Sequence, residues 1–170
     1  MKLELPTWED CQQVRLWRNQ AMSTLRTSHQ LTEEIQRKFY DDVICNPGSP
    51  HRYWSVIIKD QEPSLMGFGG ITNIQWENRL GEISLIIAPS LRGKGVGEKA
   101  VDLLLDKAFN YMNLQTVCGE CYYCNPAIEF WEKIVFKYNG NATTLLNKKY
   151  WNGRYWGSRY FSIDRGDYDK

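Results

Sequence analysis

The chain has 170 residues, with 21 basic and 20 acidic side chains and 5 cysteines. This length suits a single domain over residues 1–170, and the nearly balanced charge argues against a general nucleic-acid-binding surface. Because the sequence lacks both the roughly 18 unbroken apolar residues of a membrane span and the apolar core of a signal peptide, we expect a cytoplasmic protein with reduced thiols and no membrane partner.

The first quarter of the chain predicts a short strand followed by two helices. Residues 3–5 alternate as a strand does, and Thr7 is then a helix cap with an acidic residue three positions later. A second helix should begin at Thr32 and end near Cys45. The apolar residues expected on its buried face are Ile35, Phe39, Val43 and Ile44. The polar segment 21–31 between the helices is a loop that could border a substrate cleft.

Three strands joined by short turns should follow. The predicted strands cover residues 51–59, 65–76 and 80–88, and the turns cover residues 60–63 and 77–78. Connections this short imply an antiparallel meander.

The third of these strands leads into the most informative stretch of the chain. Branched apolar residues end at Pro89, and the run Arg92-Gly93-Lys94-Gly95-Val96-Gly97 then turns into a helix that reaches Tyr111. Glycines let backbone N–H groups approach a ligand, and a helix N-terminus carries partial positive charge. The stretch therefore predicts a pyrophosphate site, to which Arg92 and Lys94 add charge. Its spacing fits neither a P-loop nor the dinucleotide-binding fingerprint.

The remaining residues predict a strand, a helix and a hairpin. A helix separates the strand at 115–122 from the strand at 80–88, so the two should be parallel neighbours. Asn125-Pro126 should begin a short helix at 127–134. Strands at 142–150 and 154–163 should flank the turn Trp151-Asn152-Gly153.

Three cysteines are spaced as in some metal sites. Strand alternation places Cys118 and Cys124 on one face and Cys121 on the other, and no histidine is near in sequence to add a fourth ligand. We therefore expect buried cysteines and no metal.

The stretch Gly81–Gly97, followed by Asn125–Lys133, resembles the acyl-CoA-binding region of the GNAT superfamily of N-acetyltransferases. The order of predicted elements is similar to the GNAT fold over nearly the whole chain. The resemblance implies an α/β (α+β) fold with a mixed central sheet of about seven strands, helices on both faces and a V-shaped splay between two central parallel strands. Trp17-Arg18-Asn19 and His51-Arg52-Tyr53-Trp54 resemble the branch that acetylates the N-terminal amines of proteins, including ribosomal proteins, and nucleotide-linked amino sugars, particularly those of the pseudaminic acid pathway.

The resemblance also implies acetyl-CoA as the cosubstrate. The backbone of Ile86, Ile87 and Ala88 would pair with the pantetheine arm and polarise the thioester carbonyl. The residues that would hold the pyrophosphate are Arg92, Gly93, Lys94, Gly95, Val96 and Gly97. The asparagine of the family aligns on Cys124, so Asn125, one position later, either reaches the cofactor or only caps a helix.

Acetyl transfer to an amine requires a base and a proton donor for the leaving thiolate. Glu82 is the first candidate base and Glu120 the second, although Glu82 could instead be a salt-bridged residue at a strand end. The tyrosine that the family uses as the acid is replaced here by Trp131, which could steady the sulfur or belong to the core. Tyr122 and Tyr123 are close enough in sequence to replace the missing acid.

Six residues are candidates for binding the acceptor, although a surface ion pair or a core position explains any one of them more simply. They are Arg18, Asn19, His51, Arg52, Trp54 and Trp76. The arginines could hold a nucleotide phosphate, and the tryptophans could stack on a base or a sugar.

The favoured function is acetyl-CoA-dependent N-acetylation of a primary amine by direct transfer, with a small-molecule acceptor in the form of a nucleotide-linked amino sugar. The alternatives are the N-terminal amine of a protein, an amine on a modified nucleobase, and a non-catalytic acyl-CoA sensor. The exposed edge of the C-terminal hairpin could pair with a second copy of the chain to form a homodimer.

Overall fold

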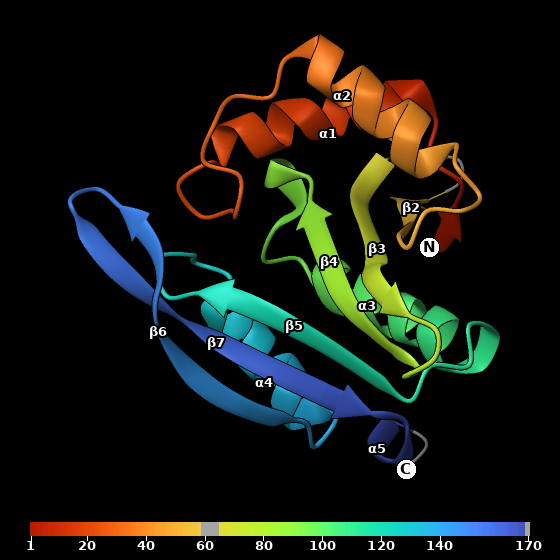
Figure 1. Ribbon diagram of the computed structural model, residues 1–170, viewed down its shortest axis with the longest axis vertical. Helices are drawn as coiled ribbons and strands as arrows, with labels where there is room; N and C mark the ends of the chain where they lie inside the picture. The colour runs from red at the N-terminus through yellow and green to blue at the C-terminus, as the bar shows by residue number, and fades with distance from the viewer. Residues whose placement is uncertain (59–64, 169–170) are drawn as a thin grey trace.

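The computed structural model describes residues 1–58 and 65–168, and these contain a mixed seven-stranded sheet in the order β1-β2-β3-β4-β5-β7-β6 (Figure 1). The strands are β1 (Lys2–Glu4), β2 (Arg52–Ile57), β3 (Leu65–Gln75), β4 (Leu80–Ile87), β5 (Thr116–Tyr122), β6 (Asn141–Trp151) and β7 (Arg154–Asp164). Neighbouring strands are antiparallel except β4 and β5, which are parallel. The predicted meander and the predicted parallel pair are both confirmed. The turn predicted at 60–63 lies outside the described residues.

Helices cover both faces of this sheet, as predicted. They are α1 (Trp8–Gln20), α2 (Glu33–Phe39), α3 (Val96–Asp106), α4 (Ile128–Lys137) and the short α5 (Arg165–Tyr168). π-helical segments extend α2 through Ile44 and α3 through Tyr111. Thr7 forms the expected capping box, since its Oγ1 accepts from the Asp10 N–H at 3.1 Å and its own N–H donates to Asp10 Oδ2 at 3.0 Å.

The two parallel strands separate after three residue pairs. β4 and β5 pair from Leu80 with Thr116 to Glu82 with Cys118. Beyond that point β4 stays paired with β3, and β5 stays paired with β7. Figure 1 shows the two arrows starting side by side and diverging toward their tips. This is the predicted V-shaped splay, and it leaves the edge of β4 beyond Glu82 facing an opening rather than a strand.

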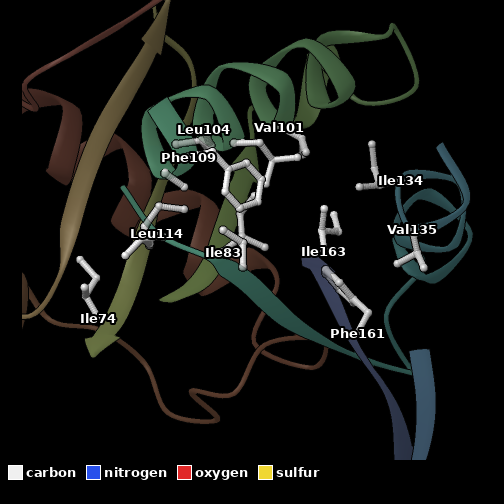
Figure 2. Packing of buried hydrophobic residues seen from close by; sticks show 14 residues of the cluster. Ile74, Ile83, Val101, Leu104, Phe109, Leu114, Ile134, Val135, Phe161 and Ile163 are labelled. Carbon is white, nitrogen blue, oxygen red and sulfur yellow. The ribbon is translucent and has the colours of Figure 1, made fainter. Parts of the chain in front are cut away.

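The main core lies between the sheet and the two helices α3 and α4. Figure 2 shows Leu104 and Phe109 of the α3 segment close to Ile83 of β4, and Val135 of α4 beside Phe161 of β7. The ring of Phe161 also explains why β5 has a glycine at position 119, because a Cβ there would lie only 2.3 Å from that ring. The apolar face of α3 thus anchors the helix that follows the glycine turn.

On the opposite face, α1 packs on β3 and β4 through a second cluster that includes Val14, Trp17 and Phe68. Phe39 and Ile44 pack against this cluster as predicted, but the predicted position of Ile35 is wrong, since it is 43% exposed. Gln36 takes the buried position instead, with 2% exposure. The helix is therefore rotated, relative to the prediction, so that a polar side chain points inward. The spacing of apolar residues in the sequence does not reveal this rotation.

Within the described ranges, no helix combines the length and apolar character needed to cross a membrane. The cysteines are all free thiols. Cys11 and Cys121 are buried, and burial is the main cause that raises the pKa of each of these thiols to about 12.

Candidate active site

A cavity of about 340 Å³ lies at the opening between β4 and β5. Its walls come from β2, β3, β4 and β5, from α1, α2 and α4, and from the segment 21–31, which we call the strap. Eight of the predicted candidate residues line it, namely Arg18, His51, Glu82, Ile86, Glu120, Tyr122, Asn125 and Trp131. Segments far apart in the sequence thus meet at the point where the parallel strands separate.

Strand alternation determines which side chains reach this cavity. On β4, Ile83 belongs to the main core, so its neighbour Glu82 lies on the opposite face, which borders the cavity. On β5, Val117 belongs to the same core, and Glu120 and Tyr122 lie on the cavity face. The two predicted candidate bases therefore face one another across the splay.

A guanidinium group lies between these two carboxylates. Nη2 of Arg26, from the strap, donates to Oε1 of Glu82 and, at 3.2 Å, to Oε2 of Glu120. The second oxygen of Glu82 accepts from Asn73 Nδ2 at 3.0 Å, and the second oxygen of Glu120 accepts from Ser158 Oγ at 2.6 Å. The Glu82 and Glu120 side chains are only 18% and 9% exposed. Every carboxylate oxygen in this cluster therefore has a donor.

The charges around the cavity follow from burial and from this cluster. Burial alone would lower the pKa of Arg26, but its hydrogen bond and ion pairing with Glu82 outweigh burial and raise that pKa above its ordinary value. Burial, followed by the charge of Glu120, raises the pKa of the Tyr122 phenol, so Tyr122 keeps its proton at neutral pH. Burial also lowers the pKa of Arg18, whose Nη2 donates to the hydroxyl of Thr27 at 3.0 Å.

The strap itself is tied down by polar contacts. Lys149 of β6 is 6% exposed, and its ammonium donates to the backbone carbonyl of Leu25 and, at 3.0 Å, to Ser28 Oγ. At the other side, Asn125 Nδ2 donates to the carbonyl of Thr24 at 3.4 Å. Asn125 also accepts from the N–H of Ala127 at 2.9 Å, so it holds the start of α4 as well.

Sequence reasoning missed Arg26, Lys149 and the role of the strap. The one signal in the sequence was the polar, irregular character of residues 21–31, which predicted a loop beside a cleft but not which side chain enters it.

Four of the predicted acceptor residues lie away from the cavity. Asn19 exchanges two hydrogen bonds with the backbone of Leu31, at 3.0 and 2.8 Å, and so holds the end of the strap. Arg52 donates to carbonyl groups of the loop before β2. Trp54 packs against the main core on the other face of the sheet, and Trp76 is 48% exposed at the turn between β3 and β4. None of the four lines the cavity.

The predicted proton donors divide in the same way. Tyr123 pairs its hydroxyl with Thr144 Oγ1 at 2.8 Å and does not reach the cavity, whereas Tyr122 does. Trp131 lines the cavity but stacks on Phe161 at a centroid distance of 5.2 Å and packs against the main core. Packing in the core, one of the two roles considered for Trp131 from the sequence, therefore explains the position of much of its side chain.

His51 lies at the cavity wall and accepts a hydrogen bond from the Asn73 N–H through Nδ1, at 3.1 Å. Burial and then the charge of Arg52 lower its pKa. A neutral imidazole fits this contact, since protonation would remove the lone pair that accepts the bond.

The edge of β4 presents alternate backbone groups to the opening. The N–H of Ala88 donates to the carbonyl of Met66 at 2.9 Å, so Ala88 and, by alternation, Ile86 turn their backbone groups toward β3. Ile87 turns toward the opening, where its carbonyl accepts from Arg92 Nε at 3.2 Å. Of the three residues predicted to pair with the pantetheine arm, only Ile87 therefore turns its backbone groups toward the opening, and by alternation Leu85 does the same.

The glycine turn that follows β4 is open to solvent. Gly93 and Gly95 have φ angles of 73° and 77°, and an added Cβ at either position would meet nothing within 4 Å. The turn leads directly into α3, whose first N–H groups have no partner inside the helix. Arg92 and Lys94 are both exposed beside it. These groups can bind an anion such as a diphosphate, because the backbone is accessible and the local charge is positive.

Comparisons with known proteins agree with this geometry. Residues 1–133 match the family model described as acetyltransferase (GNAT) domain. A spermidine N(1)-acetyltransferase of Vibrio cholerae serotype O1 is 29% identical over 99 residues, which cover 58% of this chain and 56% of that protein. The aligned part thus spans little more than half of this curated relative.

Solved structures of spermidine N-acetyltransferase from Vibrio cholerae share the fold over nearly the whole chain. A complex with CoA and spermine has a TM-score of 0.85 at 21% identity, with 99% of this chain and 98% of that chain covered. A mutant form has a TM-score of 0.82 at 22% identity, with 99% and 97% covered. These relatives are named for spermidine, so they give no support to the narrower resemblance to protein N-terminal and amino-sugar acetyltransferases. The family match over residues 1–133 shows that this chain belongs to the acetyltransferase (GNAT) domain family.

Proposed function

We propose that the protein is an acetyl-CoA-dependent N-acetyltransferase that transfers the acetyl group directly to a primary amine. The observation that carries the proposal is the position of Glu82. Its carboxylate faces a cavity at the point where β4 and β5 separate, beside an edge of β4 that no neighbouring strand pairs with beyond Glu82. Family membership supports the same reaction.

The residues at the opening fit acetyl-CoA. The turn from Arg92 to Gly97 offers accessible backbone and positive charge for the diphosphate, and the backbone of Leu85 and Ile87 faces the space that the pantetheine arm would occupy. When bound, acetyl-CoA supplies the thioester that is attacked. An N–H group of the β4 edge would then stabilise negative charge on the thioester oxygen.

Two side chains would move the protons. Glu82 accepts a proton from the acceptor's ammonium group, directly or through water, so that the neutral amine can attack. Of the two tyrosines considered from the sequence, Tyr122 rather than Tyr123 is the candidate donor to the leaving sulfur, because it lines the cavity and keeps its proton. Trp131 lies in the same wall of the cavity, and its ring helps to define the shape of the cavity.

The acceptor that the cavity favours is a cationic amine. Glu82 and Glu120 give this part of the wall two negative charges, and the side chain that lies between them is itself a cation. The relatives named above are spermidine N-acetyltransferases, which supports a polyamine as the acceptor class.

A nucleotide-linked amino sugar remains a second candidate because of Arg18. Its guanidinium lines the cavity, and its side-chain hydrogen bond goes to a neutral hydroxyl, that of Thr27. A phosphate group could replace that weak partner with a bidentate contact.

Release of free CoA from acetyl-CoA, followed with a thiol reagent, tests the proposal. The acceptors should be spermidine, a nucleotide-linked amino sugar, the same sugar without its nucleotide, a peptide with a free N-terminus and an amine-bearing nucleotide. We expect turnover with spermidine, and mass spectrometry should detect the acetylated amine. If only the intact sugar nucleotide reacts, the second candidate replaces the first. Binding of acetyl-CoA without turnover of any amine would instead indicate a non-catalytic sensor.

A further inference from the structure

The strap places a cation of the protein itself inside the candidate active site. We propose that Arg26 determines access to this site: its guanidinium occupies the position of the acceptor's ammonium group between Glu82 and Glu120, and the acceptor enters only by displacing it. This inference rests on the proposed function and adds to it a residue that selects the acceptor.

The hydrogen bonds of the cluster make displacement necessary. The acceptor's ammonium must reach an oxygen of Glu82 in order to lose its proton there. One oxygen of Glu82 accepts a hydrogen bond from Arg26 and the other from Asn73, and the oxygens of Glu120 accept from Arg26 and Ser158. Lys148 adds a more distant ion pair, with its Nζ 3.8 Å from Glu120 Oε1, and has no contact with Glu82 among those described. Among the hydrogen-bond donors Arg26 is the one that carries charge, so an arriving cation can replace it without leaving a carboxylate unpaired.

Differences in exposure indicate which of the three side chains is free to move. The Arg26 side chain is 52% exposed, whereas the side chains of Glu82 and Glu120 are 18% and 9% exposed on paired strands of the sheet. The strap backbone beside Arg26 is held by Lys149 at Leu25. The arginine side chain can therefore swing out to solvent while the strap and the two carboxylates stay in place.

Displacement also explains how the site would discriminate between acceptors. A group that is cationic at this position regains the ion pairs that Arg26 gives up. A neutral or anionic group at the same position would leave Glu82 without a counter-charge and Glu120 with only Lys148, whose Nζ lies 3.8 Å from Glu120 Oε1, and burying a carboxylate in that state is costly. Arg26 would thus lower the affinity for every acceptor and lower it most for acceptors that lack a cation here.

The test compares Arg26→Ala with the wild-type protein, using spermidine as the acceptor. We expect the KM for spermidine to fall by about tenfold, as when the competent conformer is populated about one tenth of the time. We expect kcat not to fall and the affinity for CoA to stay the same. Arg37→Ala is the matched control, because Arg37 lies over the Trp8 ring at 3.5 Å and does not line the cavity. It removes the same charge and should leave the KM unchanged.

Methylguanidinium provides a second measurement. If Arg26 had a purely structural role, this small cation would not inhibit the variant more than the wild-type protein. In Arg26→Ala this small cation should fill the vacated position and inhibit competitively against spermidine, whereas the wild-type protein should be far less sensitive. Restoration of activity by methylguanidinium would overturn the proposal, because it would mean that Arg26 assists catalysis. An unchanged or higher KM in Arg26→Ala would overturn it as well.

Two further arrangements keep the test decisive. Arg26→Gln retains the length and a hydrogen-bond donor, and it replaces Arg26→Ala if thermal unfolding shows that the alanine variant is not folded. Calorimetric titration of spermidine in the presence of CoA measures the gain in affinity without any turnover. A gain in the Arg26 variants with no turnover in any protein would reject the proposed function alone. Turnover with no gain would reject the role of Arg26 alone.

Discussion

Replacement of Gly95 by alanine should separate backbone strain from cofactor binding. Gly95 has φ of 77°, where an L-residue other than glycine costs roughly 1–2 kcal/mol. Alanine also reduces the freedom of the unfolded chain, which offsets part of this strain, so we expect a net loss of about 1 kcal/mol in the free energy of unfolding. For a chain of this size the melting temperature should then fall by about 2–4 °C.

The same change should have a larger effect on CoA. A Cβ at Gly95 would meet no protein atom within 4 Å, so the methyl group would point into the space where the diphosphate must approach the backbone. We expect the affinity for CoA to fall by at least about tenfold, which corresponds to about 1.4 kcal/mol. Thermal unfolding and calorimetric titration with CoA measure the two effects separately.

Gly153 is the matched control for this experiment. It lies in the turn between β6 and β7 with φ of 79°, and an added Cβ there also meets nothing within 4 Å. Gly153→Ala should therefore cost similar stability and leave CoA binding unchanged. If Gly95→Ala binds CoA as tightly as Gly153→Ala does, the assignment of the diphosphate to the glycine turn is refuted.

Three further changes test the base, the core and the cavity wall. Glu82→Gln should lower kcat by about 10²–10⁴-fold and leave CoA affinity unchanged; an unaltered rate would remove Glu82 as the base. Leu104→Ala should destabilise the protein by about 2–5 kcal/mol in denaturant titrations, because Leu104 is fully buried in the main core; a loss well below this range would contradict that packing. His51 has a lowered pKa in the folded protein, so the unfolded chain takes up the proton first as the pH falls below about 6.5, and the wild-type protein loses stability there. His51→Gln should show a smaller fall in melting temperature between about pH 7.5 and pH 5, and an equal fall in both proteins would contradict the lowered pKa.

Local patterns in the sequence predicted the parts of the fold that local interactions determine. The capping box at Thr7, the end of β4 just before Pro89 and the glycine turn before α3 each depend on residues a few positions apart. The splay also followed from the sequence, but through resemblance to a family and not through periodicity.

The face on which a side chain lies was harder to predict. Tyr53 and Trp54 are neighbours on β2, yet Tyr53 lines the cavity and Trp54 packs against the main core. Both are large aromatic residues, so composition does not distinguish them. Ser55 lies on the same face as Tyr53 and donates to Asp10 of α1 at 2.8 Å, so alternation combined with the position of α1 would have selected Tyr53.

The strap could not be predicted from local patterns. Arg26 contacts Glu82 and Glu120, which are 56 and 94 positions away, and the segment that carries it has no helical or strand periodicity. Lys149 is similarly remote from the strap, with 124 positions between it and Leu25. Such contacts exist only once the sheet brings β4, β5 and β6 to one side of α1.

Calorimetric titration of the wild-type protein with CoA and, separately, with pantetheine tests most directly whether the glycine turn and the free edge of β4 form one acyl-CoA site. We predict that a single CoA binds per chain and that pantetheine, which lacks the diphosphate, binds at least about tenfold more weakly. The absence of any heat with CoA, or equal affinities for the two ligands, would contradict this site.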